Sequence, residues 1–479
     1  MFRRLFSIGV IVGTLMTGGS ARAQMPFPVK LIPTRTALDR LGLERQWWGV
    51  IPLVETERLL KISIGGDRLF AQTSYAILHT FDAESGRLLW SAQLGERAGF
   101  ARGVASNSFA VFVSNADVFF ALDKKTGRTI WKHELHQIPT SSPACDEQRA
   151  MLGLSSGKLY AFNLKIKDEK GNESILTAPT EAWNWQTGGP MLTRPLPAEQ
   201  VVAFGSTDGK GYVVMAFEST PLYRISTGGA IGQGLGGFGT RTLLIPSADN
   251  NLYGVDLFTA KLYWTFSSGA PIEQEPMVSD EDIYVINSVG NLSLLDPATG
   301  VPRWTTSTRG GQLVSVSATK VYLRSDNLDL FLVDRKTGRT LVDPGETFLR
   351  AGLNLRDYPL NIVNRFNDRL YFATPSGMVV CLREAGQAQP RPLKDPKALP
   401  FGYIPPEGIK ATPPAAPGAE PKIEVGVPGK EEPPAADKEK DKPDAEGKEK
   451  APADKEKEME KEKPKEPPAA GKDGEKESA

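Results

Sequence analysis

A short motif containing aspartate, glycine and tryptophan at fixed spacing recurs along the sequence. In its first clear copy, Asp82 is followed by Gly86 and Trp90. Two further full copies are Asp123, Gly127 and Trp131, and Asp296, Gly300 and Trp304. Asp256 with Trp264 and Asp334 with Gly338 are partial copies, and the motif is degenerate at Asn163, Glu218 and Arg383. Internal similarity of this kind indicates a repeat architecture, because each copy marks the same place in one structural unit.

The spacing of the motif indicates the kind of unit. Its first position falls at residues 82, 123, 163, 218, 256, 296, 334 and 383. Most intervals are close to the roughly 40 residues of a four-stranded propeller blade. The two longer intervals require insertions, which we expect as loops at residues 165–173 and near residues 349–361.

The residues of each repeat favour strands and hairpins. Runs such as 111–114 and 283–287 are rich in β-branched and aromatic residues and have no helical period. The aspartate can bond the backbone amides of a turn whose glycine takes a positive φ, and the large indole can pack between adjacent sheets. The sequence therefore predicts an all-β fold, an eight-bladed β-propeller of four-stranded antiparallel blades over residues 44–386.

The two ends of the repeat region complement each other. The last repeat, which ends near Arg383, has no tryptophan after it, whereas Trp47 and Trp48 begin the chain without a blade of their own. Pairing these segments would complete the ring and remove its free strand edges. We therefore expect Trp47 or Trp48 on the outer strand of the last blade.

The repeat pattern G-x-L-Y-A-L-D-x-x-T-G-x-x-x-W resembles that of the PQQ-like β-propeller repeat family, although the copies near residues 217 and 333 lack the tryptophan. This family includes quinoprotein alcohol dehydrogenases and the BamB type of envelope lipoprotein. The resemblance implies either a non-catalytic, BamB-like scaffold that binds protein partners in the cell envelope, or a PQQ-dependent enzyme with Ca²⁺. The sequence has neither an adjacent cysteine pair nor a Cys-x-x-Cys-His haem motif. We therefore expect the scaffold, without cofactor or metal, and keep the dehydrogenase as the alternative.

The two termini differ in composition from the repeat region. Residues 1–23 have Arg3 and Arg4, an apolar run and the small residues Ala21 and Ala23, the pattern of a secretory signal peptide. Residues 24–43 form an N-terminal extension, 387–410 an extended linker, and 411–479 a tail rich in Lys, Glu, Pro and Ala that is expected to be disordered. These features predict a monomeric periplasmic or secreted protein without an integral membrane segment. With 57 basic and 57 acidic residues, nucleic acid is not an expected partner.

Several motifs suggest chemistry that their context does not support. Residues 153–157 match the G-x-S-x-G elbow, and residues 232–237 match G-x-G-x-x-G, but neither is followed by the required helix. His133 and His136 form a poor ligand set without a carboxylate or cysteine. Cys145 and Cys381 are expected in blades far apart on the ring, as small buried side chains. No catalytic residue and no metal ligand is predicted.

The innermost strands are expected to place one residue from each blade at the mouth of an axial channel. Aligned by their strands, these positions include three cations and one carboxylate: Lys61, Arg102, Ser142, Arg194, Leu235, Glu275, Gln312 and Ile362. A field of this sort could hold an anionic group or an acidic loop of a partner. The alternative is that these polar residues only line a water-filled channel.

Overall fold

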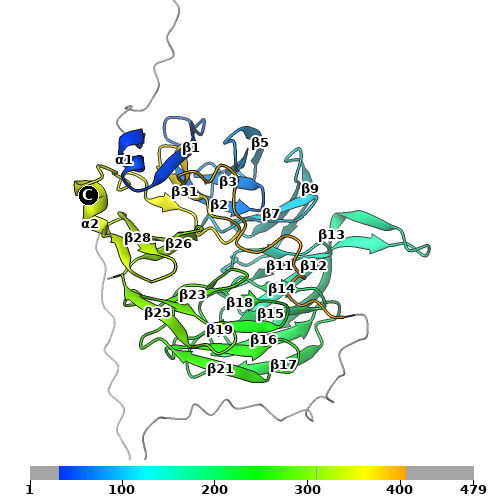
Figure 1. Ribbon diagram of the computed structural model, residues 1–479. Helices are drawn as coiled ribbons and strands as arrows, with labels where there is room; N and C mark the ends of the chain where they lie inside the picture. The colour runs from blue at the N-terminus through cyan, green and yellow to red at the C-terminus, as the bar shows by residue number, and fades with distance from the viewer. Residues whose placement is uncertain (1–31, 309, 406–479) are drawn as a thin grey trace, which may run out of the picture. The chain divides into compact units, whose positions relative to one another are not determined.

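The computed structural model describes residues 32–308 and 310–405, so the expected signal peptide and C-terminal tail lie outside the described residues. The described chain forms eight sheets of four strands each, which confirms the eight-bladed propeller (Figure 1). Within each sheet the strands follow one another antiparallel, from the innermost strand outwards, except in the blade that closes the ring.

The first four blades have these bounds. Blade 1 contains β2 (Leu59–Gly65), β3 (Arg68–Thr73), β4 (Ile77–Asp82) and β5 (Leu88–Gln93). Blade 2 contains β6 (Ala105–Ser106), β7 (Ala110–Asn115), β8 (Val118–Asp123) and β9 (Thr129–Glu134). Blade 3 contains β10 (Ala144–Cys145), β11 (Arg149–Gly153), β12 (Lys158–Lys167) and β13 (Glu173–Gln186). Blade 4 contains β14 (Leu196–Ala198), β15 (Val201–Gly205), β16 (Lys210–Met215) and β17 (Pro221–Ser226).

The other four blades complete the ring. Blade 5 contains β18 (Gly236–Phe238), β19 (Thr242–Pro246), β20 (Asn251–Asp256) and β21 (Leu262–Ser267). Blade 6 contains β22 (Met277–Val278), β23 (Ile283–Ile286), β24 (Asn291–Leu295) and β25 (Pro302–Ser307). Blade 7 contains β26 (Gln312–Val316), β27 (Lys320–Arg324), β28 (Leu330–Asp334) and β29 (Thr340–Val342). Blade 8 contains β30 (Leu360–Asn361), β31 (Leu370–Ala373), β32 (Met378–Glu384) and β1 (Leu43–Val50).

The tryptophans join neighbouring blades. The Nε1 of Trp90 in blade 1 donates to the carbonyl oxygen of Lys124 in blade 2 at 2.9 Å. Gly127 has a φ of +72°, and a Cβ there would lie 2.4 Å from the indole, so the ring rests directly on this glycine. The same arrangement recurs at three further junctions, formed by Trp47 with Gly86, Trp264 with Gly300 and Trp304 with Gly338.

The aspartates of the motif hold the hairpin on which each indole rests. Asp123 accepts hydrogen bonds from the backbone amide and the hydroxyl of Thr126, both at 2.7 Å. Burial of its carboxylate opposes ionisation, but these hydrogen bonds outweigh it and lower the pKa of Asp123. Equivalent turns occur at Asp82, Asp256, Asp296 and Asp334.

The ring closes as the sequence predicts. β1 pairs antiparallel with β32, with Trp47 opposite Cys381 and Trp48 opposite Val380. Trp47 is the indole that docks on the next blade, because its Nε1 donates to the carbonyl oxygen of Ala83 at 2.9 Å. The fully buried Arg369 of blade 8 adds an ion pair to Glu84 of blade 1 at 2.8 Å. The N-terminal strand and this ion pair therefore hold the first and last blades together.

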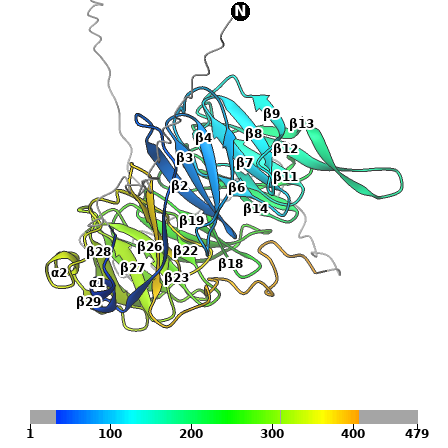
Figure 2. The ribbon, with the colours of Figure 1, turned by 90° about the horizontal axis from the view of Figure 1, so that it is seen from above.

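Of the two expected loops, the one near residues 349–361 is confirmed, whereas the one at 165–173 is largely built from strands. The insertion at residues 165–173 is a hairpin in which β12 and β13 continue outwards, and it projects from the ring in Figure 2. The insertion between blades 7 and 8 has the short helix α2 (Pro344–Leu349) before the expected loop, and residues 350–359 contain neither helix nor strand. Composition alone indicated a polar loop at residues 165–173 because this segment is rich in turn-forming and charged residues.

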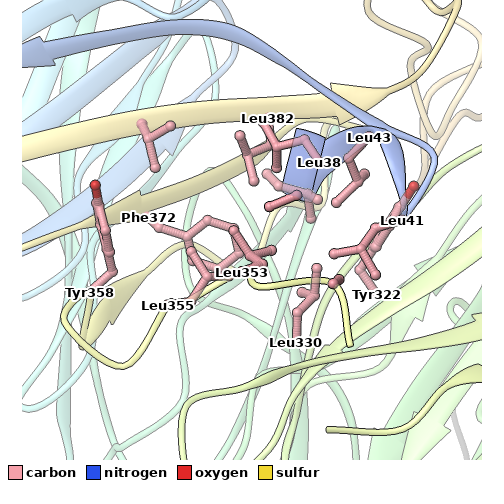
Figure 3. Close-up of a cluster of buried hydrophobic side chains, with 14 of the residues drawn as sticks. Leu38, Leu41, Leu43, Tyr322, Leu330, Leu353, Leu355, Tyr358, Phe372 and Leu382 are labelled. Carbon is pink, nitrogen blue, oxygen red and sulfur yellow. The ribbon is translucent and has the colours of Figure 1, made fainter. Parts of the chain in front are cut away.

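The N-terminal extension contributes helix α1 (Arg35–Asp39) to the core between blades 7 and 8. Leu38 and Leu41 point towards Tyr322 and Leu330 of blade 7 (Figure 3). Leu353 and Leu355, which follow α2, pack in the same cluster. Neither helix in the described ranges is long and apolar enough to cross a membrane.

The segment that follows β32 runs across the turns that leave the innermost strands, and residues 387–405 are called the strap here. The amide of Leu393 donates to the carbonyl oxygen of Phe366 in blade 8, and its own carbonyl accepts from Asp280 in blade 6. Further along, Phe401 packs against Gly237 in blade 5. The described part of the expected linker is therefore docked on one face of the ring.

Candidate functional site

A cavity of about 220 Å³ lies at the axis, where most of the lining residues precede or begin an innermost strand, and Val363 and Arg365 follow β30. This axial cavity is lined by Ser142, Leu192, Arg194, Gly232, Gln233, Gly234, Glu273, Gln274, Glu275, Gln312, Val363 and Arg365. Four of the residues expected at the channel mouth are in this set: Ser142, Arg194, Glu275 and Gln312. They come from blades 3, 4, 6 and 7, so the repeat brings together residues far apart in sequence.

An ion-pair network crosses the axial cavity. The Nη2 of Arg194 lies 3.2 Å from the Oε1 of Glu275, and the Nη2 of Arg365 lies 3.3 Å from the Oε2 of the same carboxylate. Arg194 belongs to blade 4, Glu275 to blade 6 and Arg365 to the first hairpin of blade 8. Burial lowers the pKa of Arg365, with Glu275 opposing the shift and Arg194 adding to it.

Arg365 was not among the expected residues. The alignment placed Ile362 at this position of blade 8, but Ile362 is buried in the core between blades 8 and 1. The hairpin that joins β30 to β31 is longer than its counterparts in the other blades, and Arg365 reaches the cavity from this longer hairpin. The signal in the sequence was the long interval before the last repeat, which was assigned to a loop.

Lys61 and Arg102 lie near each other on the blade 1 and blade 2 side of the axis. Lys61 is on β2, and Arg102 precedes β6. Burial, and then repulsion from Arg102, lowers the pKa of Lys61. The Nε of Arg102 donates to the carbonyl oxygen of Pro139 at 3.2 Å, and no ion pair is found for either cation among the described residues.

Of the three remaining positions, Leu235 makes no polar contact at the cavity, whereas Ser142 and Gln312 do. Leu235 is buried in the core between blades 4 and 5. Gln312 lines the cavity, where its Oε1 accepts a hydrogen bond from the Nδ2 of Asn361 at 2.9 Å. The expected polar residues therefore gather around blades 4, 6 and 7 and do not form a complete ring around the axis.

The glycine-rich motif at 232–237 belongs to the cavity wall. A Cβ on Gly234 would lie 2.3 Å from the Oε2 of Glu275, so glycine leaves the space that this carboxylate occupies. Strand β18 begins at Gly236, which confirms that these glycines serve an inner strand and do not open a helix. The other motif, at residues 153–157, is the turn between β11 and β12.

The histidines and cysteines have structural surroundings. His133 packs against Phe162 with ring centroids 5.0 Å apart. Cys145 and Cys381 are free thiols, the first half-buried and the second fully buried. Within residues 32–308 and 310–405 no group of three potential metal ligands comes together.

Fold and repeat together define the class: the chain is an eight-bladed propeller built from PQQ-like repeats. Comparison with known families then gives the finer assignment. The family described as "Outer membrane protein assembly factor BamB" matches residues 44–221 and 198–402, and the chain belongs to this family. The family is described as an assembly factor, and the chain is accordingly a non-catalytic propeller.

Individual relatives are distant. The outer membrane protein assembly factor BamB of Shewanella oneidensis is 20% identical over 294 residues, which cover 55% of this chain and 71% of that protein. BamB of Moranella endobia is 22% identical over 268 residues, which cover 51% of this chain and 66% of that protein. The crystal structure of BamB from Moraxella catarrhalis matches with a TM-score of 0.57 at 15% identity, covering 71% of this chain and 97% of that one. The designed protein Ika8 matches with a TM-score of 0.50 at 14% identity over 68% and 96% of the two chains. The last two matches show the shared fold.

Proposed function

We propose that the protein is an exported scaffold that binds protein partners during outer membrane protein assembly, through the face formed by the loops between blades. The family assignment supports the process, since the matched family consists of outer membrane protein assembly factors. The choice of face rests on the large apolar side chains that successive interblade loops expose.

Successive interblade loops each expose a large apolar side chain. Val54, Phe100, Ile138 and Leu192 lie in the four loops that lead into blades 1, 2, 3 and 4, and their exposed fractions are 57%, 76%, 53% and 48%. Leu349, the last residue of α2 in the segment that leads into blade 8, adds a side chain with an exposed fraction of 80%. In contrast, the described loops at 227–235 and 268–276 expose no large apolar side chain. Apolar side chains gathered on one face of a protein mark a surface that binds a partner.

These exposed side chains, Val54, Phe100, Ile138, Leu192 and Leu349, are called the apolar row here. The charge beside the apolar row indicates the chemistry of the partner. The guanidinium of Arg102 lies 5.9 Å from the centre of the Phe100 ring. A partner loop that presents an apolar side chain next to an aspartate or glutamate would contact both groups. Apolar contacts would supply affinity, and the charge would supply orientation.

Substitutions in the row test the proposal. Ile138→Ser and Phe100→Ser should each reduce co-purification of outer membrane assembly proteins at least about tenfold, because interface anchors carry most of the binding energy. Val301→Ser is the matched control, since Val301 has an exposed fraction of 59% and lies in the turn between β24 and β25, the two outer strands of blade 6. Arg102→Glu should also weaken capture without changing the melting temperature. Equal capture by the Ile138, Phe100 and Val301 variants would contradict the choice of face.

We also propose that the protein acts in the periplasm without PQQ or Ca²⁺. Export would follow from cleavage after Ala23, which N-terminal sequencing of the mature protein can test. Addition of PQQ and Ca²⁺ should cause no quinone absorbance shift and no alcohol- or sugar-dependent dye reduction. Robust PQQ-dependent reduction would favour the dehydrogenase alternative.

A further inference from the structure

The strap, residues 387–405, is hydrogen-bonded to blades that are not neighbours in the ring, and it is drawn in orange in Figure 1. Its Arg391 exchanges two hydrogen bonds with Asp368 of blade 8. The Arg391 amide donates to the carboxylate at 3.1 Å, and the Arg391 carbonyl oxygen accepts from the Asp368 amide at 3.1 Å. Further along, the amide of Asp395 donates to the carboxylate of Asp280 in blade 6 at 2.7 Å. One segment therefore fastens blade 8 to blade 6.

Apolar contacts anchor the strap at two further places. Leu393 is 7% exposed and packs in the core between blades 6 and 7. Phe401 lies on Gly237 of blade 5, where a Cβ would be 2.7 Å from its ring, and a Cβ on Gly402 would be 2.6 Å from Ala198 of blade 4. Burial of apolar surface at these positions offsets the entropy lost when an extended segment is ordered. The strap is thus docked from blade 8 to blade 4.

The span of the strap includes both junctions that lack the docking tryptophan. On β17 of blade 4, Tyr223 stands in place of the indole, and β29 of blade 7 has no aromatic residue. Blades 1, 2 and 3 instead dock on the next blade through Trp90, Trp131 and Trp183. Within residues 32–308 and 310–405, no hydrogen bond joins the strap to these three blades. The strap therefore reinforces the half of the ring whose junctions are less regular.

The ion-pair network of the axial cavity joins blades in this same half. Glu275 of blade 6 binds Arg194 of blade 4 and Arg365 of blade 8. Arg365 directly precedes Phe366, whose carbonyl oxygen accepts from the amide of Leu393 at 2.9 Å. The hairpin that carries Arg365 is therefore held by the strap next to the point where its guanidinium meets Glu275. Charges that are partly buried lose stability when their partners separate, so the network depends on the position of this hairpin.

We propose that the strap is a releasable clasp that sets the conformation of the half of the ring from blade 4 to blade 8. Docked, it holds the hairpin at 362–369 so that Arg365 meets Glu275; released, it loosens the junctions between blades 4 and 5 and between blades 7 and 8, and the network separates. The strap contains neither helix nor strand, so it can leave the ring without unfolding a blade. It contacts the turns that follow the innermost strands, away from the apolar row, so the clasp does not depend on the proposed scaffold function.

Hydrogen–deuterium exchange of the full-length chain, followed by mass spectrometry, tests the clasp. Phe401→Ala removes the anchor on blade 5, and Leu399→Ala is the matched control, because Leu399 lies on the same strap and is 56% exposed. If the strap releases as one unit, Phe401→Ala should speed exchange about tenfold both in the nearby turn at 238–242 and in the distant hairpin at 362–369. Strands β7 and β8 of blade 2 should exchange as in the unmodified protein. Faster exchange at 238–242 alone, or no change at either place, would overturn the proposal.

A double-mutant cycle on the urea midpoint tests the link between the strap and the network. Glu275→Gln leaves two guanidinium groups without their carboxylate and should lower the midpoint. Phe401 does not line the axial cavity, so independent sites would give additive shifts. The clasp predicts that Glu275→Gln lowers the midpoint less in the Phe401→Ala background, because release of the strap has already separated the network. Additive shifts would contradict the link, and equal acceleration of exchange in blade 2 would show that the strap is only part of one cooperative fold.

Discussion

The junction between blades 1 and 2 and the junction between blades 7 and 8 fill the same kind of gap in different ways. At the first, Trp90 from the repeat itself rests on Gly127 and bonds the backbone of the next blade. At the second, β29 has no tryptophan, and the gap is filled by Leu38 and Leu41 of the N-terminal extension together with Leu353 and Leu355 from the insertion. A repeat can therefore lose its docking residue where a distant segment supplies equal apolar volume.

Removing the indole at the regular junction should have the largest effect. Trp90 is 8% exposed, and Trp90→Ala would leave a large cavity and an unpaired carbonyl on Lys124. We expect the free energy of unfolding to fall by about 3 to 5 kcal/mol. Urea denaturation followed by circular dichroism measures the change. Leu88→Ala on the same strand is the control, because Leu88 is 43% exposed and its truncation should cost less than about 0.5 kcal/mol.

Truncating Leu38 at the junction between blades 7 and 8 should lower the free energy of unfolding by somewhat less. Leu38 is 1% exposed, and Leu38→Ala should lower the free energy of unfolding by about 2 to 3 kcal/mol, since a terminal helix can shift to reduce the cavity. The exposed neighbour Arg35 provides the control, and Arg35→Ala should leave the urea midpoint unchanged. Equal midpoints for the two variants would show that α1 is not part of the junction's core.

The junction between blades 4 and 5 is intermediate, because a tyrosine stands in for the indole. The hydroxyl of Tyr223 lies within donating distance of two carbonyl oxygens, those of Asp256 at 3.0 Å and Leu257 at 2.8 Å. Tyr223→Phe keeps the ring and removes the hydrogen bond, so a loss of about 1 to 2 kcal/mol is expected. Tyr160→Phe should have no effect on the same urea titration, since the Tyr160 hydroxyl has no hydrogen bond to any residue that the structure describes. A Tyr223→Phe variant as stable as the unmodified protein would mean that the ring alone seals this junction.

Lowering the pH should destabilise the hairpins that support the junctions. This is the smallest of the expected effects on stability. Burial opposes ionisation of Asp256, but hydrogen bonds from Arg241, Tyr263 and Thr259 outweigh it and hold its pKa at about 2. Because this folded-state pKa lies below the value of about 3.9 for an unfolded aspartate, the carboxylate stabilises the fold above pH ~4. That stabilisation should be lost as the pH falls from about 4 towards 2. Urea midpoints measured from pH 7 to 3 should therefore fall less steeply for Asp256→Asn, and parallel curves would contradict this role.

Much of the fold could be predicted because the repeat is local. The spacing of Asp82, Gly86 and Trp90 encodes a turn and a docking residue within ten residues. The structure predicted for one copy of the motif therefore applies to each blade that repeats it. The ring closure through Trp47 followed from the incomplete last repeat. The packing of α1 could not be predicted, because the cavity that it fills is formed by side chains of blades 7 and 8 that only the assembled ring brings together.

The candidate site was predicted in part for the same reason. Arg194 and Glu275 keep their place in the repeat, and the structure pairs them at 3.2 Å. Arg365 lies in a hairpin that departs from the repeat, so no alignment of blades could place it opposite Glu275. The exposed apolar row was missed because exposure depends on neighbouring loops and not on the residue type.

Site-specific photo-crosslinking in intact cells tests the central claim, that the interblade loops bind a protein partner in outer membrane assembly. A crosslinking side chain would be placed at position 100 and, as the control, at position 301, both of which are exposed in the described ring. Position 100 should crosslink to a component of the outer membrane protein assembly machinery, and position 301 should not. Crosslinking to that machinery from position 301 but not from position 100 would contradict the account.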